Sequence, residues 1–150
     1  MLNHSNIVNN AHFLAPRMYE GYEHHASRAS DPIICVPNPL YHCFGCVVGS
    51  TMTVFLNGTM VLPNPIPTTH ITADCIEQYS CNYLYGTPTM WTDLIALDSG
   101  RLNRLTSLRR GVMSGAPCPP SLVRKVISTL PSMENILVSR FSIVQFLELS

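Results

Sequence analysis

The sequence is poor in charged residues, and lysine is almost absent. Charged side chains make up 12% of the 150 residues, nine basic residues balance nine acidic ones, and Lys125 is the single lysine. Charged residues form about a quarter of an average globular protein. Proteins that bind nucleic-acid backbones need clustered lysine and arginine, so we expect no nucleic-acid partner. So few charges also indicate that part of the surface is covered by further protein.

The chain also lacks an uninterrupted hydrophobic run of membrane-spanning length. Its longest apolar tract, residues 43–62, is broken by glycines and polar residues, whereas a spanning helix needs about 20 predominantly apolar residues. We therefore expect a helix, a turn and a strand there, and no transmembrane segment. The opening MLNHSNIVNN has neither the basic start nor the apolar segment of a signal peptide, so no targeting peptide is expected in these residues.

Six cysteines are present, but their spacing does not favour a metal site. Cys43 and Cys46 form a CxxC pair beside His42, and no second pair stands at a matching spacing. A zinc site normally requires one, so we expect no metal ligands and reduced thiols in apolar surroundings, as in an intracellular compartment. A small thiol or metal protein built on Cys43 and Cys46 remains an alternative interpretation.

Hydrophobic patterns typical of strands and of helices alternate along the chain. Strands are expected at about residues 32–37, 59–62, 82–85, 110–113 and 135–138, and helices at about residues 3–18, 44–56, 68–78, 88–97 and 119–130. Polar residues 21–30, with His24 and His25, and residues 98–107 are predicted to be a loop and a linker. Strands and helices joined by short connections predict an α/β fold, a parallel sheet covered by helices.

Three loops follow strands of this predicted sheet: residues 38–45, 86–89 and 114–117. Because the carboxyl ends of parallel strands meet at one edge, we expect His42, Thr87 and the backbone of Ser114 and Gly115 to converge on one crevice. Taken singly, each signal is also consistent with packing, with a tight turn or with the start of a helix.

The same three segments resemble the motifs of a known family. PNPLYHCFG, YLYGTPTM and RRGVMSGAPCPPSLVRKV occur in the order and spacing of the adenylate-forming superfamily, which includes acyl-CoA synthetases, luciferases and peptide-synthetase adenylation domains. Within it, they are most similar to mitochondrial medium-chain acyl-CoA ligases. The opening MLNHSNIVNN is similar to the segment that follows the family's phosphate-binding loop. The resemblance implies that residues 1–138 are a partial AMP-binding (adenylation) domain, part of the large N-terminal domain of such an enzyme. It also implies that residues 139–150 are a divergent C-terminal tail.

This resemblance implies a reaction, its substrates and a location. The family joins a carboxylic acid to ATP, which gives an acyl-AMP and pyrophosphate, and then passes the acyl group to the thiol of coenzyme A. A medium-chain fatty acid, ATP and coenzyme A are therefore the implied partners, with Mg²⁺ as counter-ion and the mitochondrial matrix as the location.

The resemblance also assigns roles to the residues of the three loops. His42 matches the histidine that lies beside the reacting carboxylate and phosphate, which implies a catalytic role. The residues that match the acyl pocket are Tyr41, Phe44, Gly86, Thr87 and Pro88, and those that match the loop along the adenine are Ser114, Gly115, Ala116 and Pro117.

Other motifs of the family do not occur in these residues. The Ser/Thr/Gly-rich phosphate loop with its lysine would precede Met1. The sequence SRFSIVQF after residue 138 stands where the family has an aromatic-Gly-x-Thr-Glu motif that serves phosphate and magnesium, and Glu148 lacks that context. The ribose-binding aspartate and the small C-terminal domain with its lysine are missing too. We therefore expect this chain alone to be inactive, with a non-catalytic acyl or nucleotide binder as the alternative.

Overall fold

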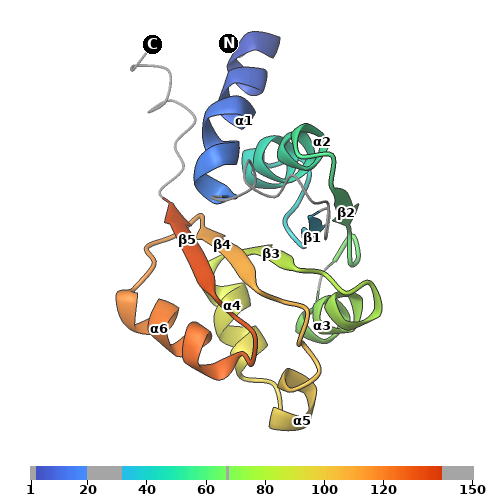
Figure 1. The fold of residues 1–150 in the computed structure, drawn as a ribbon, viewed down its shortest axis with the longest axis vertical. Coiled ribbons are helices and arrows are strands. Elements are labelled where there is room, and N and C mark those ends of the chain that lie inside the picture. Colours follow the sequence, from blue (N-terminus) through green and yellow to red (C-terminus); the bar gives the residue numbers. More distant parts are fainter. Residues whose placement is uncertain (1–2, 20–31, 67, 140–150) are drawn as a thin grey trace.

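The central element of the fold is a five-stranded parallel sheet (Figure 1). The computed structural model describes residues 3–19, 32–66 and 68–139. The strands lie side by side in the order β2-β1-β3-β4-β5, and every neighbouring pair is parallel. Their bounds are β1 (Ile33–Cys35), β2 (Thr59–Val61), β3 (Tyr83–Gly86), β4 (Arg110–Ser114) and β5 (Asn135–Ser139). The predicted α/β fold with a parallel sheet is confirmed.

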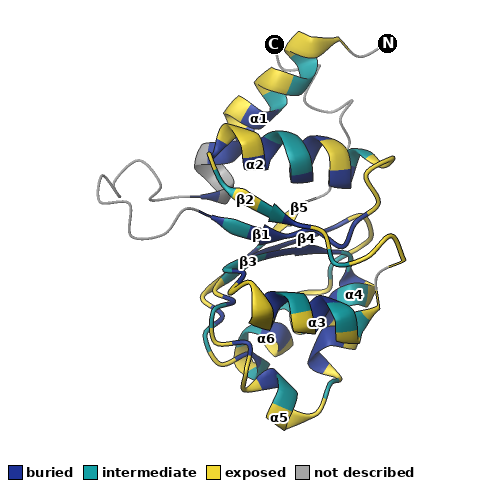
Figure 2. Cartoon of the chain, turned by 90° about the vertical axis from the view of Figure 1, so that its right-hand side faces the viewer, coloured by how far each residue is buried: buried dark blue, intermediate teal, exposed yellow. Residues whose placement is uncertain are grey.

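Helices cover both faces of the sheet. They are α1 (His4–Met18), η2 (Phe44–Thr51), α2 (Met52–Phe55), α3 (Thr69–Gln78), α4 (Pro88–Ile95), α5 (Ser99–Leu102) and α6 (Pro120–Thr129). Helices α1 and α2 lie on one side of the sheet, and α3, α4, α5 and α6 lie on the other (Figure 2). Side-chain oxygens of Asn3, Thr68, Thr87 and Asp98 accept backbone N–H groups at the starts of α1, α3, α4 and α5. Such caps fix where a helix begins.

The order of the strands creates a switch point between β1 and β3. From β1 the chain runs through η2 and α2 to β2, then returns through α3 to β3 on the other side of β1, and continues through α4 and α6 to β4 and β5. The loop after β1 therefore leads to one face, and the loop after β3 leads to the other. In open parallel sheets, ligands bind where neighbouring loops diverge in this way, beyond the carboxyl ends of the strands.

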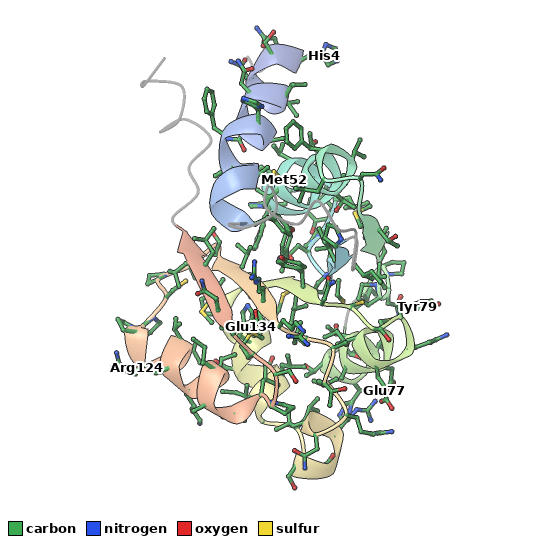
Figure 3. The ribbon with its side chains drawn as sticks, viewed as in Figure 1. His4, Met52, Glu77, Tyr79, Arg124 and Glu134 are labelled. Atoms are coloured by element: carbon green, nitrogen blue, oxygen red, sulfur yellow. The ribbon has the colours of Figure 1, made fainter. Side chains whose placement is uncertain are left out.

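Each face of the sheet has its own hydrophobic core. Trp91, Leu94 and Ile76 lie in the cluster beneath α3, α4 and α6. Tyr85 and Met52, which is labelled in Figure 3, lie in the cluster beneath α1 and η2. Burial of a large apolar side chain contributes about 1.5–3 kcal/mol to folding, so both clusters hold the strand ends in place.

Residues 98–107 differ from the linker that their polarity predicted. They include α5 and bury Leu102 and Leu105 in the hydrophobic core, and Leu108, just after them, is buried in the same core. The three leucines stand three residues apart, so they reach the same side of a chain that is helical at first. The polar residues between them are mostly exposed and gave the segment its loop-like composition.

The helix predicted at residues 44–56 is present, but its first eight residues form a π-helix, η2, before the short helix α2. This region and the other helices lack the length and apolar character of a bilayer span, within the ranges that the structure describes. The loop predicted at residues 21–30, with His24 and His25, and residues 140–150 of the predicted tail lie outside the described residues.

Candidate functional site

The three predicted loops lie side by side at the carboxyl edge of β1, β3 and β4, which are neighbours in the sheet. The loop after β1 is connected to strand β3 by aromatic stacking, because the ring of Phe44 packs on that of Tyr85, a residue of the strand. The loops after β3 and β4 also meet, since a Cβ at Gly115 would lie 3.5 Å from Cγ2 of Thr87. The structure therefore brings together the elements that carry His42, Thr87 and Gly115.

His42 is exposed, and a hydrogen bond determines which of its two ring nitrogens carries the proton. Its Nδ1 accepts the backbone N–H of Phe44 at 3.1 Å, and the Cys43 thiol lies 3.7 Å from the same nitrogen. A neutral imidazole whose Nδ1 is an acceptor carries its proton on Nε2. His42 can therefore offer its Nε2–H as a hydrogen-bond donor at the edge of the sheet.

The loop around His42 turns tightly onto η2. The backbone N–H of His42 donates to the carbonyl of Pro39 at 3.1 Å. A Cβ at Gly45 would lie only 2.3 Å from that same carbonyl oxygen, so a side chain has no room there. The two aromatic residues of the loop point to different surroundings, because Tyr41 is 94% exposed to solvent whereas Phe44 is buried.

The turn after β3 is built to start α4. The Thr87 hydroxyl accepts the N–H of Met90 at 3.4 Å, and Pro88 is the first residue of the helix. Gly86 and Pro88 are buried, and Thr87 is partly exposed. Of this turn, Thr87 is therefore the residue that a ligand at the sheet edge would meet first.

The turn after β4 presents small residues. Ser114 is buried, whereas Gly115, Ala116 and Pro117 are exposed. Gly115 has a φ of +91°, a conformation that favours glycine. Cys118 closes the turn, because its thiol donates to the carbonyls of Ala116 and Met113. Because the turn carries no large side chain, a flat ring can approach its surface closely.

Fixed charge is absent from the loops at residues 38–45, 86–89 and 114–117, which contain no Asp, Glu, Lys or Arg. All six cysteines are free thiols, including Cys43 and the exposed Cys46. In the part of the chain that the structure describes, no three His, Cys, Asp or Glu side chains gather as metal ligands. These loops therefore suit the uncharged parts of a ligand.

A hollow of about 310 Å³ lies next to this site, between the ends of β1 and β2. Two Pro-Asn-Pro segments, residues 37–39 and 63–65, line it together with Val36, Leu40 and Leu62. Asn38 is 5% exposed, and its Oδ1 has no hydrogen-bond partner. Sequence reasoning overlooked this hollow, although the repeated Pro-Asn-Pro after two strands was a visible signal.

Comparison with known proteins gives consistent matches. The sequence profile of the AMP-binding enzyme family matches residues 1–139. The mitochondrial medium-chain acyl-CoA ligase ACSF2 of Danio rerio is 35% identical over 136 residues, which are 91% of this chain and 22% of that protein. The Homo sapiens ligase of the same name is 33% identical over 138 residues, 92% of this chain and 22% of that protein. The chain thus spans about a fifth of the length of these curated relatives.

A solved structure supports the architecture. Apo MatB from Rhodopseudomonas palustris superimposes with a TM-score of 0.74 at 22% identity, and the match covers 95% of this chain and 26% of that one. At this identity the likeness shows the fold, while the family profile covers nearly the whole chain. The chain belongs to the AMP-binding enzyme family.

Proposed function

We propose that residues 1–138, a partial adenylation domain, form the acyl- and adenine-binding part of a fatty acid–CoA ligase. In this reaction a carboxylate oxygen of a medium-chain fatty acid attacks the α-phosphorus of ATP, and the bond from that phosphorus to the β-phosphate bridging oxygen breaks. The products are an acyl-AMP and pyrophosphate. The thiol of coenzyme A then attacks the acyl carbon, loses its proton and displaces AMP.

The observation that carries this proposal is the placement of His42 at the switch point. Its Nε2–H can donate to an oxygen of the carboxylate or of the α-phosphate, because Nδ1 is already occupied by the N–H of Phe44. Two anions repel each other as they approach, so a fixed donor that orients both lowers the barrier.

The neutral surfaces on either side of His42 suit the remaining parts of the two substrates. We assign Ser114, Gly115, Ala116 and Pro117 to the adenine, since this turn has small side chains and is largely exposed. The acyl group is assigned to Tyr41, Phe44, Gly86, Thr87 and Pro88. Because these loops carry no lysine or arginine, we propose that residues outside them neutralise the phosphates.

Magnesium does not fit the described residues. The loops offer no carboxylate, and the described chain holds no cluster of three metal ligands. Hard cations such as Mg²⁺ prefer oxygen ligands, so the roles above are assigned without a metal ion. We expect no turnover by this chain alone. The names of the Danio rerio and Homo sapiens relatives support a mitochondrial location, which we propose to be the matrix.

A chimera tests the proposed function. Residues 1–138 would replace the matching segment of the Danio rerio ligase, and pyrophosphate release would be measured with octanoate, ATP and Mg²⁺, followed by acyl-CoA formation after coenzyme A is added. We expect activity from the chimera and none from the isolated chain. His42→Ala should lower the rate of pyrophosphate release by about 10²-fold, whereas His70→Ala, on α3, should not.

Two results would reject these assignments. A folded chimera that forms neither pyrophosphate nor acyl-CoA would remove the ligase function. An active chimera in which His42→Ala keeps the full rate would remove the role of His42 and leave the ligase function standing.

A further inference from the structure

Two tyrosines meet beneath the loop that carries His42. The hydroxyl oxygens of Tyr19, which follows α1, and Tyr85, in β3, are 2.5 Å apart and buried. Burial is the main cause that raises the pKa of each phenol above its ordinary value, so both are neutral at physiological pH. The ring of Tyr19 also contacts that of Tyr83, with centroids 4.5 Å apart. Tyr85 is thereby fixed from the side of α1.

The opposite contact of Tyr85 leads to the site. Its ring stacks on Phe44, with centroids 6.0 Å apart and planes inclined by 16°. Phe44 is buried through its side chain, while its backbone N–H donates to Nδ1 of His42 at 3.1 Å. A continuous series of contacts therefore runs from Tyr19 through Tyr85 and Phe44 to the ring of His42.

The helix that follows His42 explains why Phe44 needs the contact with Tyr85. Phe44 is the first residue of the π-helix η2, and π-helical turns are wider than α-helical turns and often lie at functional sites. The histidine loop therefore rests on an irregular helical start. Aromatic stacking from the neighbouring strand holds Phe44 where its N–H meets the imidazole.

We propose that Tyr85 is a positioning residue, which holds Phe44 by stacking and thereby keeps His42 in its Nε2–H form at the sheet edge. Tyr19 supports Tyr85 as the hydrogen-bond partner of its hydroxyl, because a buried hydroxyl without a partner destabilises the folded protein. The effect on the His42 ring follows from this structure alone, whereas its effect on catalysis rests on the proposed function.

NMR of the chain with ¹⁵N-labelled histidine tests the proposal directly. The shifts of the two ring nitrogens of His42, recorded at a pH where the ring is neutral, report which nitrogen carries the proton. We expect the Nε2–H form in the parent chain and in Tyr85→Phe, which keeps the ring. Tyr85→Leu should move His42 toward the mixture of forms found in a free imidazole. His70, on the far side of the sheet, is the internal control.

The choice of variants separates positioning from general stability. Phe44→Leu keeps the backbone N–H but loses the stacking, so it should shift His42 as Tyr85→Leu does. Tyr19→Phe leaves one hydroxyl unpartnered and should lower stability, and the double variant with Tyr85→Phe should regain it. Emission of Trp91, the single tryptophan, reports whether each variant is folded.

The outcomes are decisive in each case. The proposal fails if the parent chain already shows a free-imidazole mixture, or if folded Tyr85→Leu or Phe44→Leu leaves the ring unchanged. If Tyr85→Leu does not fold, Phe44→Leu decides. In the Danio rerio chimera, Tyr85→Leu should lower kcat for pyrophosphate release by about tenfold with little change in KM for ATP, and Tyr85→Phe should restore kcat. An inactive parent chimera would reject the proposed ligase function but leave the NMR result valid.

Discussion

The indole ring of Trp91 occupies the space into which a side chain at Gly111 would project. Trp91 lies in α4 and donates its Nε1–H to the carbonyl of Val112 at 3.2 Å. A Cβ at Gly111 would lie 2.4 Å from Cζ2 of the indole and 2.9 Å from the carbonyl oxygen of Leu84. Helix α4 starts at the candidate site, and it can pack this closely on β4 only because residue 111 is a glycine.

Gly111→Ala should therefore destabilise the protein. Neither a buried indole nor a strand carbonyl can move freely, and overpacking of a core costs about 1–3 kcal/mol. Urea unfolding followed by circular dichroism measures the change. Gly100→Ala, at an exposed position of α5, is the control and should cost less, because alanine favours a helix over glycine by about 1 kcal/mol. Equal midpoints for the parent and Gly111→Ala would contradict the packing described here.

Gly115 should also resist substitution, but for a different reason. Its φ of +91° strains any side chain with a Cβ, while the nearest atom, Cγ2 of Thr87, is at an ordinary 3.5 Å. Gly115→Ala should cost about 1–2 kcal/mol in urea unfolding. Thr87→Ser keeps the helix cap and removes the methyl group, so it should not rescue Gly115→Ala. A rescue would show that contact, rather than backbone strain, limits this position.

The strands and most helices were predictable because their signals are local. Helices were predicted to begin at about residues 68 and 88, and the structure confirms both starts, with Thr68 as the cap of α3 and Pro88 as the first residue of α4. Residues 98–107 were wrongly predicted to be a linker, because their composition is polar although Leu102 and Leu105 are buried. Composition describes the whole segment, whereas burial depends on which side of the chain each residue occupies.

The candidate site was predictable only in part. The three loops could be placed at one edge, since a parallel sheet gathers the carboxyl ends of its strands. The contact between Tyr19 and Tyr85 could not be inferred, because 66 residues separate them and no local pattern encodes the pairing. Likewise, which nitrogen of His42 is an acceptor depends on the fold of the loop around Phe44.

The six cysteines should differ sharply in reactivity. Cys46 is exposed, whereas Cys35 and Cys81 are fully buried. A hydrogen bond to Cys81, together with burial, raises the pKa of Cys35, and the thiolate is the reactive form. Brief treatment with a thiol-alkylating reagent, read by peptide mass spectrometry, should label Cys46 before the others and Cys35 only after unfolding. Early labelling of Cys35 in the folded chain would contradict this core.

Stability should fall in acid partly through Glu134, which lies near the start of β5 (Figure 3). Its carboxylate accepts a hydrogen bond from Arg109 at 2.8 Å and contacts Arg110 at 3.5 Å. The hydrogen bond from Arg109 is the main cause that holds the pKa of Glu134 below its ordinary value. A lowered pKa in the folded state stabilises the protein above the unfolded value, and this contribution is lost as the pH falls through the folded value.

Glu134→Gln measures this contribution. The difference in unfolding free energy between the parent and the variant should be constant above about pH 5 and should shrink toward about pH 3, because glutamate has an ordinary pKa of about 4.3. The plateau should stay below about 1 kcal/mol, since the pair is half-exposed, and should decrease in 1 M salt. Glu77→Gln, which removes an equal charge beside Arg104, controls for net charge. A difference that grows as the pH falls would show that Glu134 is stabilised by protonation instead.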